Sequence, residues 1–404
     1  MLKYQGIMCR YTHNQKGVFM KRIFRTLIIA MLSVLFVLGM VACGDNGDGD
    51  GKTGLLYKMY SGDDYYTVYG YVDEGKNITS LDIASYVKEK SGEDVKIGRI
   101  KADAFKNNDT LTEIIVPTTV EVMDKGAFGY MKKLESLTLP FIGNTKNADV
   151  TFNASAPSED KSVDAERTLA YLFGETEYEE GIKVTQFYAE GGEEGSNNVE
   201  RYLPKTLKNI TVTPAEKYDI PMYAFAGNGL IKKVTLNNVG VIGDSAFKDA
   251  IALEEVSIPA TTTTINKEAF SGCVNLKTGV TFEANSTLAT LGEGVFKGCA
   301  NLKNISLPNS LQVLSKNTFS GCADLSVVKL GGVNTIKGFA FDGCASIFYV
   351  GKLDDISAIN KITIDFTGLT VEDFAFANTL TMESDAEVLG ANALDLYKIF
   401  NLAE

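Results

Sequence analysis

The residues whose side chains could most readily react or bind a metal are four cysteines, Cys273, Cys299, Cys322 and Cys344. Four cysteines in one chain could bind a zinc ion or, if the chain is secreted, form disulfides. Each of them, however, follows a phenylalanine by three residues, so all four occupy one equivalent position in successive repeats. A zinc site needs sulfur atoms that converge on one point, whereas side chains stacked in a column run parallel. We therefore predict four small, buried core residues with free thiols and no metal site; disulfide bridges between successive repeats are the alternative.

Residues for acid–base or nucleophilic catalysis are scarce in this chain. The only histidine, His13, precedes the expected mature protein, and its loss removes Ser–His pairs, Cys–His pairs and imidazole ligands. The acidic pair Glu254–Glu255 could be read as glycosidase carboxylates, but adjacent residues of one strand point to opposite faces. There is no P-loop and no Gly-rich dinucleotide fingerprint. The sequence predicts a protein that is not an enzyme and needs no cofactor.

The N-terminal region has the layout of a secretion signal. Three basic residues follow Met20 and precede an almost unbroken apolar stretch over residues 27–41. This arrangement is typical of signal peptides, and the stretch is shorter than the roughly 20 apolar residues of a membrane-spanning helix. The sequence Met40-Val41-Ala42-Cys43 resembles the lipobox of bacterial lipoproteins, in which the cysteine becomes the lipid-bearing first residue of the mature chain.

These features set the expected N-terminal boundaries. Residues 1–19 are predicted to be a mis-assigned start, residues 20–42 a lipoprotein signal peptide, and residues 43–54, rich in Gly and Asp, a flexible tether. Cys43 is the predicted site of lipid attachment. The alternative is ordinary secretory cleavage next to an incidental cysteine. A lipid at Cys43 would place the protein on the extracellular face of the bacterial cell envelope.

The charge of the mature chain limits its partners. Of the 39 basic residues, six precede Cys43, which leaves 33 against 51 acidic residues and a net charge of −18. Such a chain should be repelled by nucleic acid and by anionic lipid headgroups. Nucleic acid is therefore excluded as a partner, and the membrane is expected to be contacted through the N-terminal lipid only.

A repeated unit organises the rest of the chain. Phenylalanines recur with adjacent spacings of 22, 23 or 26 residues outside one large gap. Five residues before each stands an aliphatic residue or methionine, and six residues after each stands leucine or isoleucine. These phenylalanines, which we predict to be the structural core, are Phe105, Phe128, Phe225, Phe247, Phe270, Phe296, Phe319 and Phe341.

Each repeat contains one expected strand. The segment Leu253-Glu-Glu-Val256-Ser-Ile258 alternates apolar and polar residues, which is strand geometry with one face inward and the other in water. Pro259 then ends the strand, because proline cannot donate to a ladder. One repeat cannot bury its apolar face alone, so we expect the strands to stack into a parallel sheet about 4.8 Å apart.

The most regular repeats contain the sequence motif Ala-Phe-x-Gly-Cys-x-x-Leu, as in residues 269–276. This repeat motif resembles the BspA-type leucine-rich repeat of bacterial surface lipoproteins. The resemblance implies a leucine-rich-repeat solenoid, mostly β, with a curved parallel sheet on one face, short turns or helical turns on the other, and terminal caps. It assigns residues 55–99 to an N-terminal cap with the first repeat, residues 100–383 to the repeats, and residues 384–404 to a C-terminal cap helix.

The gap between Phe128 and Phe225 is expected to hold one irregular repeat. Phe173 resembles a repeat anchor, and Leu207 begins the corresponding strand segment, so residues 175–201 are predicted to be an inserted, structureless loop. At the other end, both Phe374 and Phe376 satisfy the repeat spacing. The closing helix is predicted over residues 388–402.

The expected function is binding through the exposed side of the parallel sheet. Leucine-rich repeats commonly bind through this face, which a solenoid extends into a platform. The resemblance implies a non-catalytic surface lipoprotein that binds an extracellular protein or glycan. Adhesion is one role that the resemblance implies for such binding. Alternatives are a structural component of the envelope without a specific ligand and a carbohydrate-processing surface enzyme. The candidate binding residues are Thr211, Lys233, Thr235, Glu255, Ser257, Ser306 and Lys329.

Overall fold

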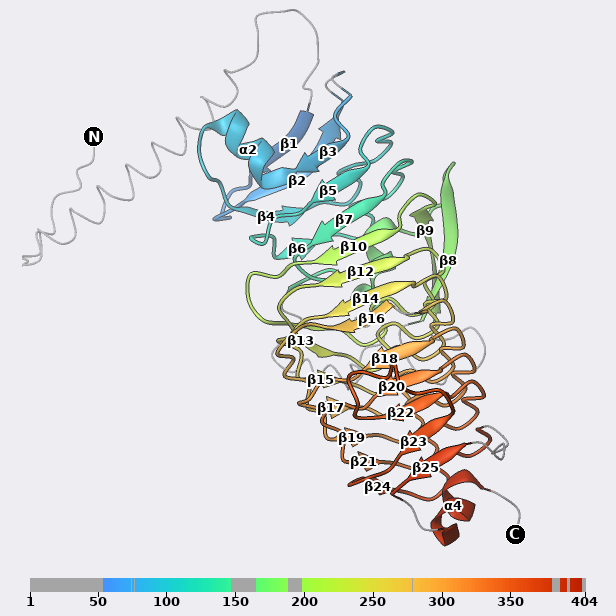
Figure 1. Cartoon of the computed structure of the whole chain (residues 1–404). Coiled ribbons are helices and arrows are strands. Elements are labelled where there is room, and N and C mark those ends of the chain that lie inside the picture. Colours follow the sequence, from blue (N-terminus) through green and yellow to red (C-terminus); the bar gives the residue numbers. More distant parts are fainter. Residues whose placement is uncertain are drawn as a thin grey trace, which may run out of the picture. The chain divides into compact units, whose positions relative to one another are not determined.

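The computed structural model describes residues 54–73, 75, 77–146, 165–187, 198–277, 279–379, 386–390 and 393–401. The chain divides into two compact units, residues 1–51 and 52–404, and the described residues all belong to the second (Figure 1). The predicted signal peptide, the predicted lipid site Cys43 and nearly all of the predicted tether lie outside the described residues. The second unit is a β-solenoid of stacked repeats, as the sequence predicts.

The predicted strand of each repeat is present, and we call these the front strands. They form a seven-stranded and a five-stranded sheet in which all neighbours are parallel (Figure 1). The first sheet contains β3 (Ser80–Asp82), β5 (Glu113–Ile115), β7 (Ser136–Leu139), β10 (Asn209–Val212), β12 (Lys233–Leu236), β14 (Glu255–Ile258) and β16 (Gly279–Phe282). The second contains β18 (Asn304–Ser306), β20 (Val327–Lys329), β22 (Tyr349–Gly351), β23 (Thr363–Asp365) and β25 (Glu387–Leu389).

Most turns of the solenoid contain a second, shorter strand that the sequence did not predict. These rear strands end at or beside the aliphatic residue five positions before each phenylalanine. Most span only two to four residues, too few for an alternating pattern to be recognised. They are β4 (Ile97–Ile100), β6 (Val122–Met123), β11 (Tyr218–Ile220), β13 (Val239–Ile242), β15 (Thr264–Ile265), β17 (Thr290–Leu291), β19 (Val313–Leu314), β21 (Thr335–Ile336) and β24 (Thr370–Val371).

All eight predicted phenylalanines are buried at the turns that follow the rear strands. From Phe225 to Phe376 the rings of successive turns stack with centroids 4.6–5.6 Å apart. Phe376 continues this ladder, whereas Phe374 is 40% exposed. The irregular repeat joins through Phe173, whose ring centroid lies 6.3 Å from that of Phe128. The phenylalanines therefore form two runs of adjoining rings, from Phe105 to Phe173 and from Phe225 to Phe376, inside the hydrophobic core, and we call the two runs together the spine.

The glycine of the repeat motif is required by the backbone conformation at its position. Gly272, Gly298, Gly321 and Gly343 each stand two residues after the phenylalanine and have φ between 71° and 75°. This left-handed conformation is easy for glycine and costly for most other residues. The glycine thus lets the chain turn sharply after the buried ring.

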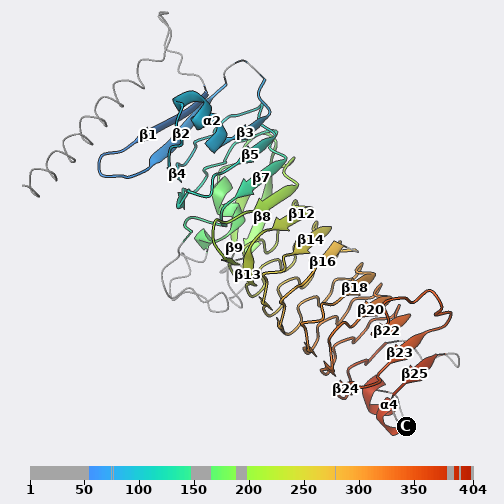
Figure 2. The same ribbon diagram turned by 60° about the vertical axis from the view of Figure 1, so that its left-hand side comes forward.

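The predicted loop over residues 175–201 is wrong at residues 181–187 and 198–201, which form strands, while residues 188–197 lie outside the described residues. β8 (Gly181–Phe187) pairs antiparallel with β9 (Asn198–Pro204) in a two-stranded sheet (Figures 1 and 2). Val184 and Gln186 face inward and are buried. Because one of these two inward positions is polar, the segment does not show the apolar alternation of a half-buried strand.

Gln186 ties this hairpin to the solenoid. Its Oε1 accepts the amide of Ala170 at 2.9 Å, in the helical turn η1 (Leu169–Phe173). Its Nε2 donates to the carbonyl oxygens of Tyr223 and Ala224 at 3.1 and 2.9 Å. The hairpin is therefore a packed element that bridges the irregular repeat and the turn of Phe225.

Each end of the solenoid has a cap. At the N-terminal end β1 (Gly54–Met59) pairs antiparallel with β2 (Tyr66–Val72), β2 pairs parallel with β4, and α2 (Ile83–Ser91) follows β3 (Figure 2). At the C-terminal end the helix α4 spans Ala393–Phe400, and residues 387–389 form β25 instead of the predicted start of the helix. α4 continues the spine, because the Phe400 ring lies 5.4 Å from that of Phe376.

Candidate binding face

The outward side chains of the front strands form two rows across the seven-stranded sheet. Backbone register places Thr211 beside Thr235, and Thr235 beside Ser257. In the next row Lys233 lies beside Glu255, and their charged ends are 2.8 Å apart. The structure therefore brings these five predicted residues together on three adjacent strands.

The electrostatics of these rows are modest. The Lys233–Glu255 pair is about half exposed on both sides, and such pairs contribute little to stability in water. Beside it, Lys232 and Glu254 are 2.7 Å apart, and this hydrogen bond lowers the pKa of the Glu254 carboxyl. The rows carry alternating hydroxyl, ammonium and carboxylate groups, which suits hydrogen bonding to a polar ligand.

The remaining predicted residues, Ser306 and Lys329, belong to the five-stranded sheet, where they are register neighbours. The ladder between the two sheets is interrupted, because β16 and β18 are not paired. The predicted single column is therefore two columns. The break falls in the repeat with the 26-residue spacing between Phe270 and Phe296. In this repeat β16 begins nine residues after its phenylalanine instead of eight, and seven residues join β16 to β17, where five join β14 to β15.

A hollow of about 480 Å³ opens at this interruption. Ser306 and Lys329 line it from the five-stranded sheet, and residues that follow β16 line it from the other side. Its full lining is Phe282, Glu283, Asn285, Ser286, Ser306, Leu307, Pro308, Asn309, Lys329, Gly331, Lys352 and Asp354. Because front strands end here, the loops that follow them surround the hollow.

The lining of this hollow is rich in hydrogen-bonding groups. The Lys329 ammonium donates to the backbone carbonyl of Asp354, and the Glu283 carboxylate accepts the amide of Ala260 at 3.0 Å. Two lysines, two carboxylates, two asparagines and two serines share the lining. Such a concave, polar surface can orient a hydroxylated or charged ligand by several directed bonds.

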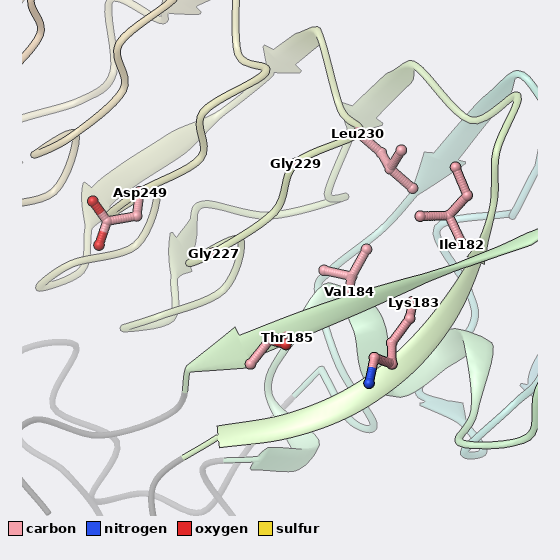
Figure 3. A pocket seen from close by; sticks show the side chains of 8 residues that line it. All are labelled: Ile182, Lys183, Val184, Thr185, Gly227, Gly229, Leu230 and Asp249. Carbon is pink, nitrogen blue, oxygen red and sulfur yellow. The ribbon is translucent and has the colours of Figure 1, made fainter. Parts of the chain in front are cut away.

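A second pocket, of about 530 Å³, lies between β8 and the turns after Phe225 and Phe247. Figure 3 shows Ile182, Val184 and Leu230 gathered at one end of it and Asp249 at the other. Burial raises the pKa of Asp249, and the nearby Glu268 raises it further. We take the front hollow as the candidate site, because two of the predicted binding residues, Ser306 and Lys329, line it.

The four cysteines are buried and free of disulfides. Each Sγ donates to the backbone carbonyl of the phenylalanine one turn earlier, at 3.0–3.2 Å. Burial raises the pKa of Cys299 and Cys344 to about 12. A buried thiol with a raised pKa is a poor nucleophile, so these groups link turns of the solenoid.

No cluster of three or more His, Cys, Asp or Glu side chains within the part of the chain that the structure describes could hold a metal ion. No helix among the described elements is long and apolar enough to cross a membrane.

The sequence analysis missed six polar residues of the hollow, namely Glu283, Asn285, Ser286, Asn309, Lys352 and Asp354. All six lie in the loops after front strands, where no apolar period marks their orientation. The unusual spacing after Phe270 was the available signal, since an insertion in one repeat maps to a loop on one face.

One protein family combines the features described above, namely the repeat motif, the phenylalanine spine and the front and rear strands of each turn. The family model described as "BspA type Leucine rich repeat region" matches residues 92–160 and 218–348, with six copies. The chain belongs to the BspA-type leucine-rich-repeat family. The copies found in this BspA-type chain include the turns of all four buried cysteines.

Solved structures with partial similarity to this BspA-type chain come from several bacteria. A leucine-rich repeat protein of T. pallidum is 26% identical, over 44% of this chain and 78% of that one, with a TM-score of 0.37. A leucine rich cell surface protein of Faecalibacterium prausnitzii is 17% identical, over 89% and 99%, with a TM-score of 0.28. A leucine-rich repeat protein of Eubacterium ventriosum is 16% identical, over 85% and 97%, with a TM-score of 0.33. No curated protein matches the chain.

Proposed function

We propose that this BspA-type protein is a non-catalytic binding protein of the bacterial cell surface, attached by a lipid at Cys43. Its ligand is an extracellular protein or glycan that lies along the front strands and enters the hollow. The observation that carries the proposal is the interrupted front sheet, where exposed polar rows lead to a hollow lined by Ser306 and Lys329. A scaffold without a ligand would need neither the interruption nor the polar lining.

Binding can be tested with the lipid-anchored chain displayed on vesicles and probed with arrays of matrix proteins and glycans. Lys329→Glu inverts the charge in the hollow and should weaken capture of the ligand by at least about tenfold. Lys297→Glu makes the same charge change one residue after a spine phenylalanine, away from the front strands, and should leave capture unchanged. Equal capture by both variants, or no capture by the native chain, would contradict the binding proposal.

The anchor has its own test. Cells grown with a labelled fatty acid should incorporate the label into the native chain and not into Cys43→Ala. A label that persists in the variant would contradict lipid attachment at this residue. The control is Cys322→Ala, which should keep the label because that thiol is buried in the solenoid.

A further inference from the structure

The N-terminal cap has an exposed face of its own on the β1–β2–β4 sheet. Backbone register places Lys58 opposite Thr67, and Thr67 opposite Arg99. The other side of the same strands packs against the core, where Tyr57 and Tyr66 meet edge to face at 5.8 Å. We call the outer side the lysine–tyrosine face; it consists of Lys58, Tyr60, Tyr65, Tyr69 and Lys101.

Aromatic rings and ammonium groups alternate on this face. The Lys58 ammonium lies 4.5 Å from the Tyr60 ring centre and 5.2 Å from that of Tyr69, and the Lys101 ammonium lies 4.6 Å from the Tyr60 ring centre. Thr67 beneath these side chains is only 1% exposed. The rings therefore form an ordered layer over the strands.

Two cations of this layer keep their charge available. Within the described residues no carboxylate pairs with Lys58 or Lys101, whereas the neighbouring Lys96 and Arg99 lie 3.2 and 2.7 Å from Glu121 and Asp124. Contact with an aromatic ring holds an ammonium group in place without neutralising it. The hydrogen bond from Lys101 lowers the pKa of the Tyr60 hydroxyl, in accord with the positive potential here.

The position of the lysine–tyrosine face in the chain indicates which surface it can reach. Ten residues lie between Cys43 and Gly54 at the start of β1, and the eleven steps of a fully extended chain from one to the other span at most about 40 Å. If Cys43 carries the lipid of the proposed function, on which this inference rests, the N-terminal cap is the part of the solenoid nearest the headgroups. A short tether gives an effective concentration in the millimolar range.

Local contacts outweigh the net charge at this distance. Repulsion between the acidic solenoid and anionic lipid is screened over about 8 Å at physiological ionic strength. Near an anionic surface each lysine strengthens binding by about fivefold, and tyrosines favour the headgroup region. For a tethered cap, two free lysines and three tyrosines therefore suffice to bias its orientation.

We propose that the lysine–tyrosine face docks on anionic lipid headgroups and holds the solenoid in a defined orientation at the membrane. This proposal departs from the expectation, drawn from the net charge of the chain, that only the lipid touches the membrane. The face belongs to the sheet of rear strands, so docking leaves the front strands and their hollow free for a ligand.

The test uses the full lipid-anchored chain in vesicles, with amine acylation of each lysine followed by mass spectrometry. In vesicles rich in phosphatidylglycerol, Lys58 and Lys101 should be acylated at least about fivefold more slowly than in pure phosphatidylcholine. High salt should abolish the difference. Lys232 and Lys303, on the front side, should be acylated at equal rates in both vesicles.

A variant pair sharpens the result, with Lys96 as its reporter. Lys58→Gln/Lys101→Gln should remove the protection of Lys96 in anionic vesicles, whereas the control Lys232→Gln/Lys303→Gln should keep it. Equal acylation of Lys58 and Lys101 in both vesicles, in a chain whose Cys43 carries lipid, would overturn docking and leave the proposed anchor and binding face standing. A chain without lipid on Cys43 would overturn both docking and the anchor.

Discussion

One equivalent position of the repeat makes different hydrogen bonds in the N-terminal and C-terminal turns of the solenoid, because it holds different side chains. The position three residues after the spine phenylalanine holds Asn108, Met131, Asn228 and Ala250 in the N-terminal part, and the four cysteines in the C-terminal part. Each asparagine Oδ1 accepts two amides of its own turn, at 2.8–3.1 Å. Each cysteine Sγ donates to a phenylalanine carbonyl of the preceding turn.

This difference separates stabilisation within a turn from stabilisation between turns. In a solenoid the stability is approximately the sum of intrinsic repeat terms and nearest-neighbour interface terms. The asparagines strengthen the first kind, and the cysteines strengthen the second. The C-terminal turns should therefore unfold more cooperatively than the N-terminal turns, where Gln186 of the hairpin supplies the link between neighbours.

The largest expected effect comes from the spine, which both regions share. Phe270→Ala should lower the free energy of unfolding by about 3–5 kcal/mol, because it leaves a cavity between two stacked rings. Chemical denaturation followed by circular dichroism measures this loss. The exposed Phe374→Ala is the matched control and should cost well under half as much. An unchanged midpoint for Phe270→Ala would mean that the spine does not stabilise the repeats.

Removing the hairpin link should have the next largest effect. Gln186→Leu keeps the side-chain volume but leaves the buried amide of Ala170 without a partner, so about 2–3 kcal/mol of stability should be lost. Thr185→Ala, on the exposed side of the same strand, should stay within about 0.5 kcal/mol. If both variants unfold with the native midpoint, the hairpin does not join the two repeats.

The asparagine and cysteine positions allow a direct comparison. Asn228→Ala leaves two buried amides, of Leu230 and Ile231, unpaired and should cost about 2–3 kcal/mol. Cys299→Ala should cost only about 1 kcal/mol, because the Phe270 carbonyl still accepts the amide of Cys273 at 3.2 Å. Thermal unfolding of both variants measures the order. A larger loss for Cys299→Ala would reverse the assignment of these roles.

The thiols also predict a pH dependence. Burial raises the folded-state pKa of Cys299 and Cys344 to about 12, from an ordinary value of 9.0. The neutral thiol is thus favoured by folding, and its contribution is fully present below pH 9 and is lost as the pH rises toward 12. Denaturation at increasing pH should show a steeper loss for the native chain than for Cys299→Ala/Cys344→Ala. Parallel curves would show that the thiols are not desolvated.

Recurrent features could be predicted from the sequence and unique ones could not. Phe270 and Val256 stand at offsets that every regular repeat shares, so comparison among repeats identified the spine and the front strands. Gln186 occurs once, in an inserted hairpin, and its role depends on backbone atoms of Tyr223 and Ala224, which are distant in sequence. The hollow also depends on a single irregular spacing, so the sequence did not show that Ser306 and Lys329 lie on a separate sheet from the other five candidate residues.

We infer that the four cysteines have a structural role, although their side chains are the most reactive in the chain, and that the exposed front strands bind the ligand. Thiol counting in the freshly purified, unreduced mature chain tests this most directly. We expect no reaction with a thiol reagent in the native state and four reactive thiols after denaturation, since the lipid would block Cys43. Fewer than four thiols would contradict this inference by showing bridges between turns, and rapid labelling of the native chain would contradict it by showing an accessible, reactive cysteine.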